Sequence, residues 1–173
     1  LGVWIDKNLN RKTHIENLVS ELRRLQYVFY RIRKFLNHNT LRILYHALYQ
    51  SRLCYGIVIW GGAFDTHLNC LKVAQNTTVR TIFGTSAEYS ATNIYRKFDI
   101  LPYTALYQYF LLLYMIRNKE QFLTYTLEKN TRNACMPLCQ LPNILNENNR
   151  HNISYAGPKL YNDSIVSNKK IAD

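Results

Sequence analysis

Positively charged and aromatic residues recur between residues 23 and 34 at the spacing of one helix face. The row consists of Arg24, Tyr27, Arg31 and Lys34. These residues follow one another at intervals of three, four and three, so a helix would place them on one side. At 1.5 Å of rise per residue the row would span about 15 Å, enough to meet several successive backbone phosphates. A tyrosine between the cations could pack on sugars or stack on bases.

The chemistry that this row predicts is the binding of a polyanion through its phosphates. The alternative is a basic face that is only solvated, which is the commoner meaning of such rows on helices. Lys72 and Arg80, two cations from later in the chain, are added as further candidate contacts. The candidate contact residues are Arg23, Arg24, Tyr27, Arg31, Arg33, Lys34, Lys72 and Arg80.

The composition favours the binding hypothesis. The 173 residues include 22 Lys and Arg but 11 Asp and Glu, which gives a net charge of +11 and a pI near 9.6. Such a balance indicates nucleic acid as the first partner and an anionic membrane surface as the second. The apolar fraction of 47% is typical of a globular domain rather than a disordered chain. The longest uncharged apolar stretch, residues 105–116, falls short of the roughly 18 residues that a membrane span needs.

Patterns typical of catalysis are missing from the sequence. The acidic residues form no close pair, although two-metal phosphoryl transfer needs clustered carboxylates. There is neither a phosphate-binding G-x-x-x-x-G-K-S/T loop nor a G-x-S-x-G elbow. Cys135, Cys139 and His151 could supply three zinc ligands, but they lack the C-x-x-C spacing and a fourth ligand. We therefore expect no catalytic residue, metal, cofactor or small-molecule substrate in this chain. We expect its cysteines to be free intracellular thiols.

The helix that must carry the basic row is predicted from its apolar residues. They recur at intervals of three and four, and Thr13 with Glu16 forms a capping box at the expected start. The predicted inward stripe is Ile15, Leu18, Val19, Leu22, Leu25, Val28, Phe29, Ile32 and Phe35.

Four more helices are expected after this one. The second runs from Asn39 or Thr40 to before Gly56, and its inward residues are Leu41, Leu44, Tyr45, Leu48 and Tyr49. The third runs from Asp65 to the stop at Gly84. The fourth runs from Ser90 to Phe98, and the fifth from Tyr103 to about Lys129.

The two ends of the chain have different patterns. Residues 1–6 alternate apolar with small or polar side chains, which predicts one strand of a hairpin. Residues 130–173 are rich in Asn, contain three of the four prolines and lack periodicity, which predicts a loosely structured tail. The expected fold is thus mainly α, with a short N-terminal β element and an irregular C-terminal tail.

Four short motifs follow one another along nearly the whole chain. They are L-G-V-x-I-D-x-x-L at residues 1–9 with H-I at 14–15, L-Y-x-x-L-x-x-x-x-L-x-Y-G-x-x-x-W-G at 44–61, L-x-x-L-x-x-x-Q-N-x-x-V-R-x-I-x-G at 68–84 with I-L-P at 100–102, and Y-x-G-P-K-L-Y-N at 155–162. In this order they resemble the C-terminal region of the reverse transcriptases of non-LTR (LINE-type, jockey-like) retrotransposons. Arg11, Ala156 and Tyr161 depart from the family pattern, which has Trp, Arg and Trp there.

The resemblance implies a division of the chain into three parts. Residues 1–12 would end the palm near the primer grip, 13–129 would form the helical thumb-like domain, and 130–173 would be a post-thumb tail. The thumb would hold an RNA–DNA hybrid or DNA duplex across its minor groove through phosphate contacts. The catalytic carboxylates and their Mg²⁺ would belong to the palm of the parent polymerase, which acts in the nucleus, so we expect this chain alone to be inactive.

Three alternatives stay open. A self-contained enzyme would require a carboxylate or His–Cys cluster that forms only in three dimensions. The chain could be a basic helical module that binds proteins or membrane surfaces, including a retroelement remnant without activity. The motif residues could also be retained for packing, which we favour for Tyr55 and Trp60, whereas Arg80 could equally cap a neighbouring helix or meet a phosphate. The other motif residues with this choice are Gly56, Gly61, Gln75 and Asn76.

Overall fold

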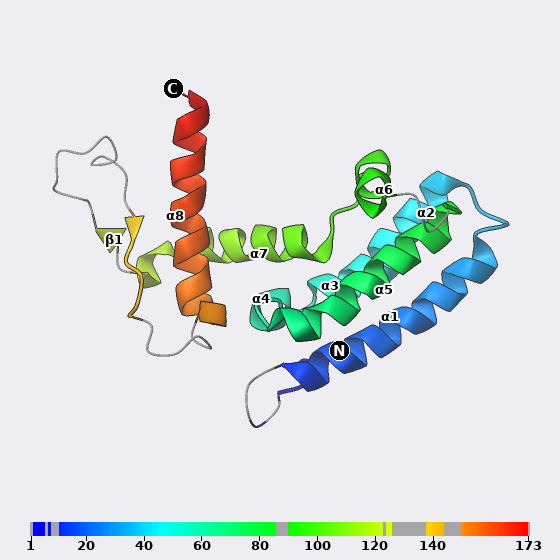
Figure 1. The fold of residues 1–173 in the computed structure, drawn as a ribbon, viewed down its shortest axis with the longest axis horizontal. Coiled ribbons are helices and arrows are strands. Elements are labelled where there is room, and N and C mark those ends of the chain that lie inside the picture. Colours follow the sequence, from blue (N-terminus) through cyan, green and yellow to red (C-terminus); the bar gives the residue numbers. More distant parts are fainter. Residues whose placement is uncertain are drawn as a thin grey trace. The chain divides into compact units, whose positions relative to one another are not determined.

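The fold is mainly helical, as predicted, in a computed structural model of the chain (Figure 1). The structure describes residues 2–5, 7, 11–85, 90–122, 124–125, 138–143 and 150–172. The chain divides into two compact units. The first comprises Leu1–Tyr107 and the second Gln108–Asp173.

The first unit holds the helix that carries the predicted basic row. Its elements are α1 (Lys12–Ile32), α2 (His38–Leu44), the π-helix η1 (Tyr45–Gln50), α3 (Ser51–Cys54), α4 (Ile57–Trp60), α5 (Asp65–Phe83), α6 (Ala91–Lys97) and the first residues of α7 (Tyr103–Arg117). The elements α2, η1 and α3 follow one another without a break, so they form the single second helix that the sequence predicts.

The core of this unit lies where α1 and α5 pack side by side (Figure 1). Leu22 and Phe29 of α1 and Leu71, Val79 and Ile82 of α5 are almost completely buried. Burying an apolar side chain of this size contributes about 1.5–3 kcal/mol, so these residues fix the two helices together. The opposite surface of α1 is therefore left to solvent.

The start of α1 differs from the predicted capping box. The helix begins at Lys12 and its N-cap is Arg11, which has a left-handed backbone and makes no side-chain capping bond. Because the Arg11 carbonyl already accepts from the Ile15 N–H at 3.2 Å, Thr13 lies inside the first turn and cannot act as the cap. The Glu16 carboxylate lies 3.9 Å from the Lys12 ammonium instead.

Two residues of the predicted inward stripe of α1 are exposed. Val28 is 44% exposed and Phe35 is 85% exposed. Phe35 points to solvent because the helix ends at Ile32, so the helical spacing no longer applies to it. The buried face of α1 is consequently shorter than its apolar periodicity suggests.

The π-helix changes which residues of the second helix face inward. The buried residues are Leu41, Tyr45, Tyr49 and Leu53, each four positions after the last. A π turn is wider than an α turn, so residues four apart stay on the same face. Leu48, predicted to face inward from α-helical spacing, is therefore exposed.

The short β element does not lie at the N-terminus. Residues 2–5 form no strand, and the Trp4 N–H instead donates to Nδ1 of His14 at 3.4 Å. Alternating side chains alone do not make a strand, because a strand also needs a partner for its backbone groups. The strands described are β1 (Thr124–Tyr125) and β2 (Leu138–Cys139), which pair antiparallel in the second unit.

A long helix replaces much of the irregular tail expected over residues 130–173. The second unit contains the rest of α7, the short 3-10 helix η2 (Lys119–Gln121), both strands and α8 (Ile153–Ala172). Gly157 and Pro158 lie inside α8, although both residue types disfavour helix interiors. At Gly157 packing overrides that preference, since a Cβ there would lie 2.5 Å from the Met115 sulfur of α7.

The fifth helix is shorter than predicted. It ends at Arg117 rather than near Lys129.

In the second unit, Asn162 of α8 is hydrogen-bonded to the strand β2. Its side-chain amide both accepts from and donates to the backbone of Cys139 at 2.9 Å. This pairing fixes α8 to the β element.

Candidate nucleic-acid interface

The predicted basic row lies on the solvent-facing side of α1 and the turn that follows it. Arg24, Tyr27, Arg31 and Lys34 are all exposed, and Tyr27 has 64% of its surface accessible. Within the described part of the chain, no ion pair involves the three cations of this row. Their charges are thus available to a ligand.

Cations are frequent around the row, and acids are absent from the long stretch of sequence that contains it. The sequence has no Asp or Glu from Leu22 to Phe64. The two acids before it are paired, Glu16 with Lys12 at 3.9 Å and Glu21 with Arg52 at 3.7 Å. The cations of the acid-free stretch are Arg23, Arg24, Arg31, Arg33, Lys34, Arg42 and Arg52. A surface of one sign attracts a polyanion over a longer range than isolated charges do.

A groove of about 440 Å³ runs beside the row, between α1 and α5. Arg23, Tyr27 and Tyr30 line it from α1, and Val73 and Thr77 line it from α5. Tyr30 is 48% exposed and Val73 is 59% exposed. The groove thus offers aromatic and aliphatic surface next to a guanidinium, which suits the sugar and base parts of a nucleic acid.

Some of the residues that line this groove could be predicted from the sequence. Arg23, Gln26, Tyr30 and Arg33 repeat the intervals of three, four and three, so they form a second row adjacent to the first. The groove residues Val73 and Thr77 could not be predicted from the sequence, because nothing in the spacing of α5 shows that it lies against this side of α1.

Arg33 has a different environment from the other predicted contacts. Its Nη1 donates to the carbonyl of Thr81 at 2.8 Å, and its guanidinium lies 4.9 Å from the centre of the Tyr30 ring. Thr81 belongs to the last turn of α5, where a positive charge is favoured by the helix dipole. Arg33 therefore ties the end of α1 to the end of α5 and is half-buried.

Lys72 and Arg80 do not belong to the surface on α1. Both come from α5. Lys72 is exposed and lines a separate pocket, whereas Arg80 is half-buried near Tyr95. Burial raises the pKa of Tyr95, and the positive charge of Arg80 partly opposes that rise. The structure thus groups the candidates of α1 together and separates these two from them.

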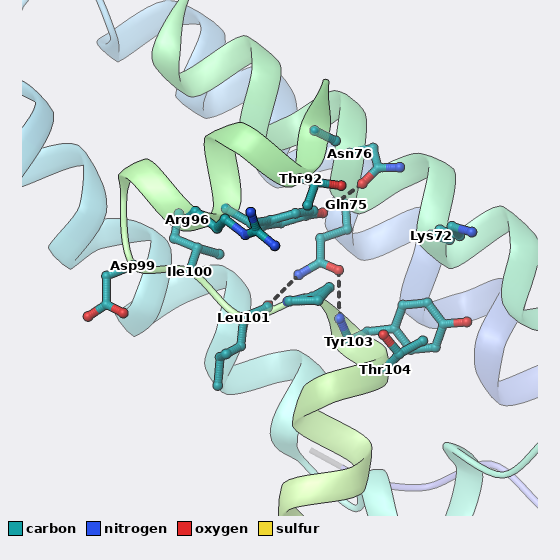
Figure 2. A pocket seen from close by; sticks show the side chains of 13 residues that line it. Lys72, Gln75, Asn76, Thr92, Arg96, Asp99, Ile100, Leu101, Tyr103 and Thr104 are labelled. Carbon is teal, nitrogen blue, oxygen red and sulfur yellow. Dashed lines mark hydrogen bonds between the residues drawn. The ribbon is translucent and has the colours of Figure 1, made fainter. Parts of the chain in front are cut away.

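The motif residue Gln75 has a packing role (Figure 2). Its side chain is 1% exposed. Its Nε2 donates to the Tyr45 hydroxyl at 2.9 Å and to the Leu101 carbonyl at 3.1 Å, while its Oε1 accepts from the Tyr103 N–H at 2.9 Å. One amide thereby joins the π-helix, α5 and the start of α7.

The aromatic motif residues also contribute to packing. Trp60 is fully buried, and its indole N–H donates to the Tyr55 carbonyl at 2.9 Å. Gly61 lies against the ring of Tyr107. The packing interpretation therefore fits Trp60 and Gly61, whereas the side chain of Tyr55 is 42% exposed.

The described residues form neither a metal site nor a membrane span. No group of three His, Cys, Asp or Glu side chains is placed to hold a metal ion there. Cys135, one of the three possible zinc ligands, lies outside the described residues. Of the helices that the structure describes, none is long and apolar enough to cross a membrane.

The chain was also compared with known proteins. No family model, no curated protein and no solved structure matches it.

Proposed function

We propose that the first unit binds a nucleic-acid duplex through the basic row of α1 and the groove beside it. The observation that carries this proposal is the exposed, unpaired row of Arg24, Arg31 and Lys34 within a stretch that has no acidic residue. The cations contact phosphates, and the groove tyrosines contact sugars or unstacked bases.

The ordered motifs give this proposal a biological setting. We take the chain as the template–primer-binding segment of a retrotransposon RNA-directed DNA polymerase. Its partners are then an RNA–DNA hybrid or DNA duplex and the palm and fingers of the parent enzyme, acting in the nucleus. The Mg²⁺ and the carboxylates of polymerisation belong to that palm, so this chain binds and positions the duplex without catalysing synthesis.

A specific observation favours a second function, binding to an anionic membrane surface. Val28 and Phe35 are apolar side chains exposed beside the cations of α1. Exposed apolar residues on a basic helix are typical of elements that lie in the membrane interface. The experiment must therefore separate a duplex from a lipid surface.

The test measures binding of a fluorescent RNA–DNA hybrid by anisotropy. The wild-type chain is expected to bind, and the variant Arg24→Glu with Arg31→Glu to bind at least tenfold more weakly, because two phosphate contacts become repulsive. The control variant, Arg117→Glu with Lys159→Glu, makes the same charge change at exposed positions of the second unit. Its affinity should stay close to that of the wild type.

Competition distinguishes the two functions. Unlabelled hybrid should displace the fluorescent hybrid, whereas vesicles containing an anionic phospholipid should not. Displacement by vesicles at similar charge concentration would favour the membrane function, and equal losses in both double variants would show that only net charge matters.

A further inference from the structure

A second hollow of the first unit lies between α5, α6 and the start of α7 (Figure 2). Its volume is about 610 Å³. Pockets for small ligands typically have about 300–1,000 Å³, so a single nucleotide would fit this one. The pocket is separate from the groove between α1 and α5, which is lined by other residues.

The floor of the pocket is held rigidly. Gln75 fixes the start of α7 against α5 through its bonds to Leu101 and Tyr103. The Tyr95 hydroxyl donates to Oδ1 of Asn76 at 2.7 Å, which holds α6 against α5. A ligand would thus enter a pocket that already has its shape, without the cost of ordering these helices.

Three of the polar side chains around the pocket offer hydrogen-bond donors: Lys72, Asn76 and Arg96. Lys72 comes from α5 and Arg96 from α6, and both are exposed. Neither has an ion-pair partner among the described residues. Because Oδ1 of Asn76 accepts from Tyr95, its Nδ2 is left to donate. Asp99 is the one acid in the lining, so the pocket favours an anion with several oxygen acceptors.

Part of the remaining lining is apolar, beside the hydroxyl groups of Thr92 and Thr104. Ile100, Leu101 and Pro102 contribute to the wall where the chain enters α7. A simple inorganic anion would make no use of such a wall, whereas a nucleotide combines charged phosphates with a flat base and a sugar. The combination of donors and apolar wall therefore indicates a nucleotide.

The pocket and the groove are separate hollows that lie beside neighbouring residues of α5. Lys72 and Asn76 line the pocket, while their chain neighbours Val73 and Thr77 line the groove. A helix with its side chains is about 10–12 Å wide, so a strand held in the groove can reach the pocket across α5 within a few nucleotides. The same nucleic acid can thus occupy both.

We infer that this pocket binds one unpaired nucleotide of the nucleic acid that α1 holds. Lys72 and Arg96 contact the phosphates on its two sides, Asn76 donates to an acceptor of the nucleotide, and the base lies against Leu101 and Pro102. This inference rests on the proposed function, because the duplex on α1 brings the nucleotide to the pocket.

The test compares two duplexes with the same base pairs and 5′-phosphates. One is blunt, and the other has one unpaired nucleotide at each 5′ end. The wild-type chain should bind the overhanging duplex about tenfold more tightly, since the unpaired base buries apolar surface against Leu101 and Pro102. The measured quantity is the ratio of the two affinities at one salt concentration.

Two single-charge variants locate the effect. Arg96→Gln should lower the ratio to near one, whereas Lys97→Gln removes the same charge from the next residue, which does not line the pocket, and should keep the ratio. Both residues are exposed, so circular dichroism should show the same helical content for both variants.

The outcomes separate this inference from the proposed function. If the blunt duplex binds but the overhang gives no preference, or if Arg96→Gln keeps the preference, the pocket assignment is wrong and duplex binding by α1 stands. If neither duplex binds, both proposals are wrong.

Discussion

At the scale of single residues, two kinds of long polar side chain in the first unit differ in what they contact. Gln75 and Arg33 bond to groups far away in sequence, Gln75 to the backbone near Pro102 and Arg33 to the carbonyl of Thr81. Arg24 and Arg31 face solvent without ion-pair partners among the described residues. The first kind stabilises the fold, and the second kind is available to a ligand.

The role of Gln75 predicts a large loss of stability in Gln75→Leu. The change leaves the Tyr45 hydroxyl, the Leu101 carbonyl and the Tyr103 N–H without their partner, and each unpaired buried group costs about 1–3 kcal/mol. We expect the free energy of unfolding, from urea titration, to fall by about 3 kcal/mol. The same substitution at the exposed Gln108 should change it by less than about 0.5 kcal/mol. Similar values for the two variants would contradict the packing role.

His14 predicts a dependence of stability on pH. It is almost fully buried, and burial lowers its pKa below 6.5, although Glu21 acts in the opposite direction. The unfolded chain therefore binds a proton more readily than the folded one, and stability falls as the pH drops below about 6.5. Protonation would also remove the Nδ1 acceptor of the Trp4 N–H.

The measurement is the urea midpoint at pH 7 and at pH 5. It should fall between these values in the wild type and fall less in His14→Leu, while His67→Gln, which leaves His14 in place, should behave like the wild type. An equal drop in His14→Leu would assign the acid sensitivity to other groups.

At the scale of elements, α5 shows what local sequence determines. Its start near Asp65 and its stop at Gly84 were both predicted, because signals at the ends of a helix act within one turn. Asp65, expected to cap the helix, lies in its first turn instead, and the N-cap is Phe64, which makes no side-chain capping bond. The π-helix and α8 were not predicted. In α8, packing against α7 outweighs the poor helix propensity of Gly157, as its close approach to Met115 illustrates.

The end of α5 gives a prediction for Gly84. Its φ of +65° is left-handed, and a Cβ there would meet no atom within 4 Å, so backbone strain is the only cost of a side chain. Gly84→Ala should lower the free energy of unfolding by about 1 kcal/mol. Gly84→Asn should lower it less, because Asn tolerates this conformation better. Equal losses in urea titration would show that the strain does not decide the cost.

At the scale of the whole molecule, net charge was readable from composition but its distribution was not. The excess of cations predicted a polyanionic partner, and helical spacing placed the basic row on α1. The groove beside α1 and the pocket beside α6 depend on which helices pack together. Residues such as Tyr30 and Arg96 acquire their place in a site only through that packing.

The most direct test of duplex binding by α1 is the salt dependence of hybrid affinity. In a plot of log affinity against log salt concentration, each phosphate contact contributes a slope of about −0.9 for a B-form DNA duplex. We predict a steep negative slope for the wild type, one that becomes shallower by about 2 in Arg24→Glu with Arg31→Glu and is unchanged in Arg117→Glu with Lys159→Glu. A slope that is the same in the wild type and both double variants would contradict the account.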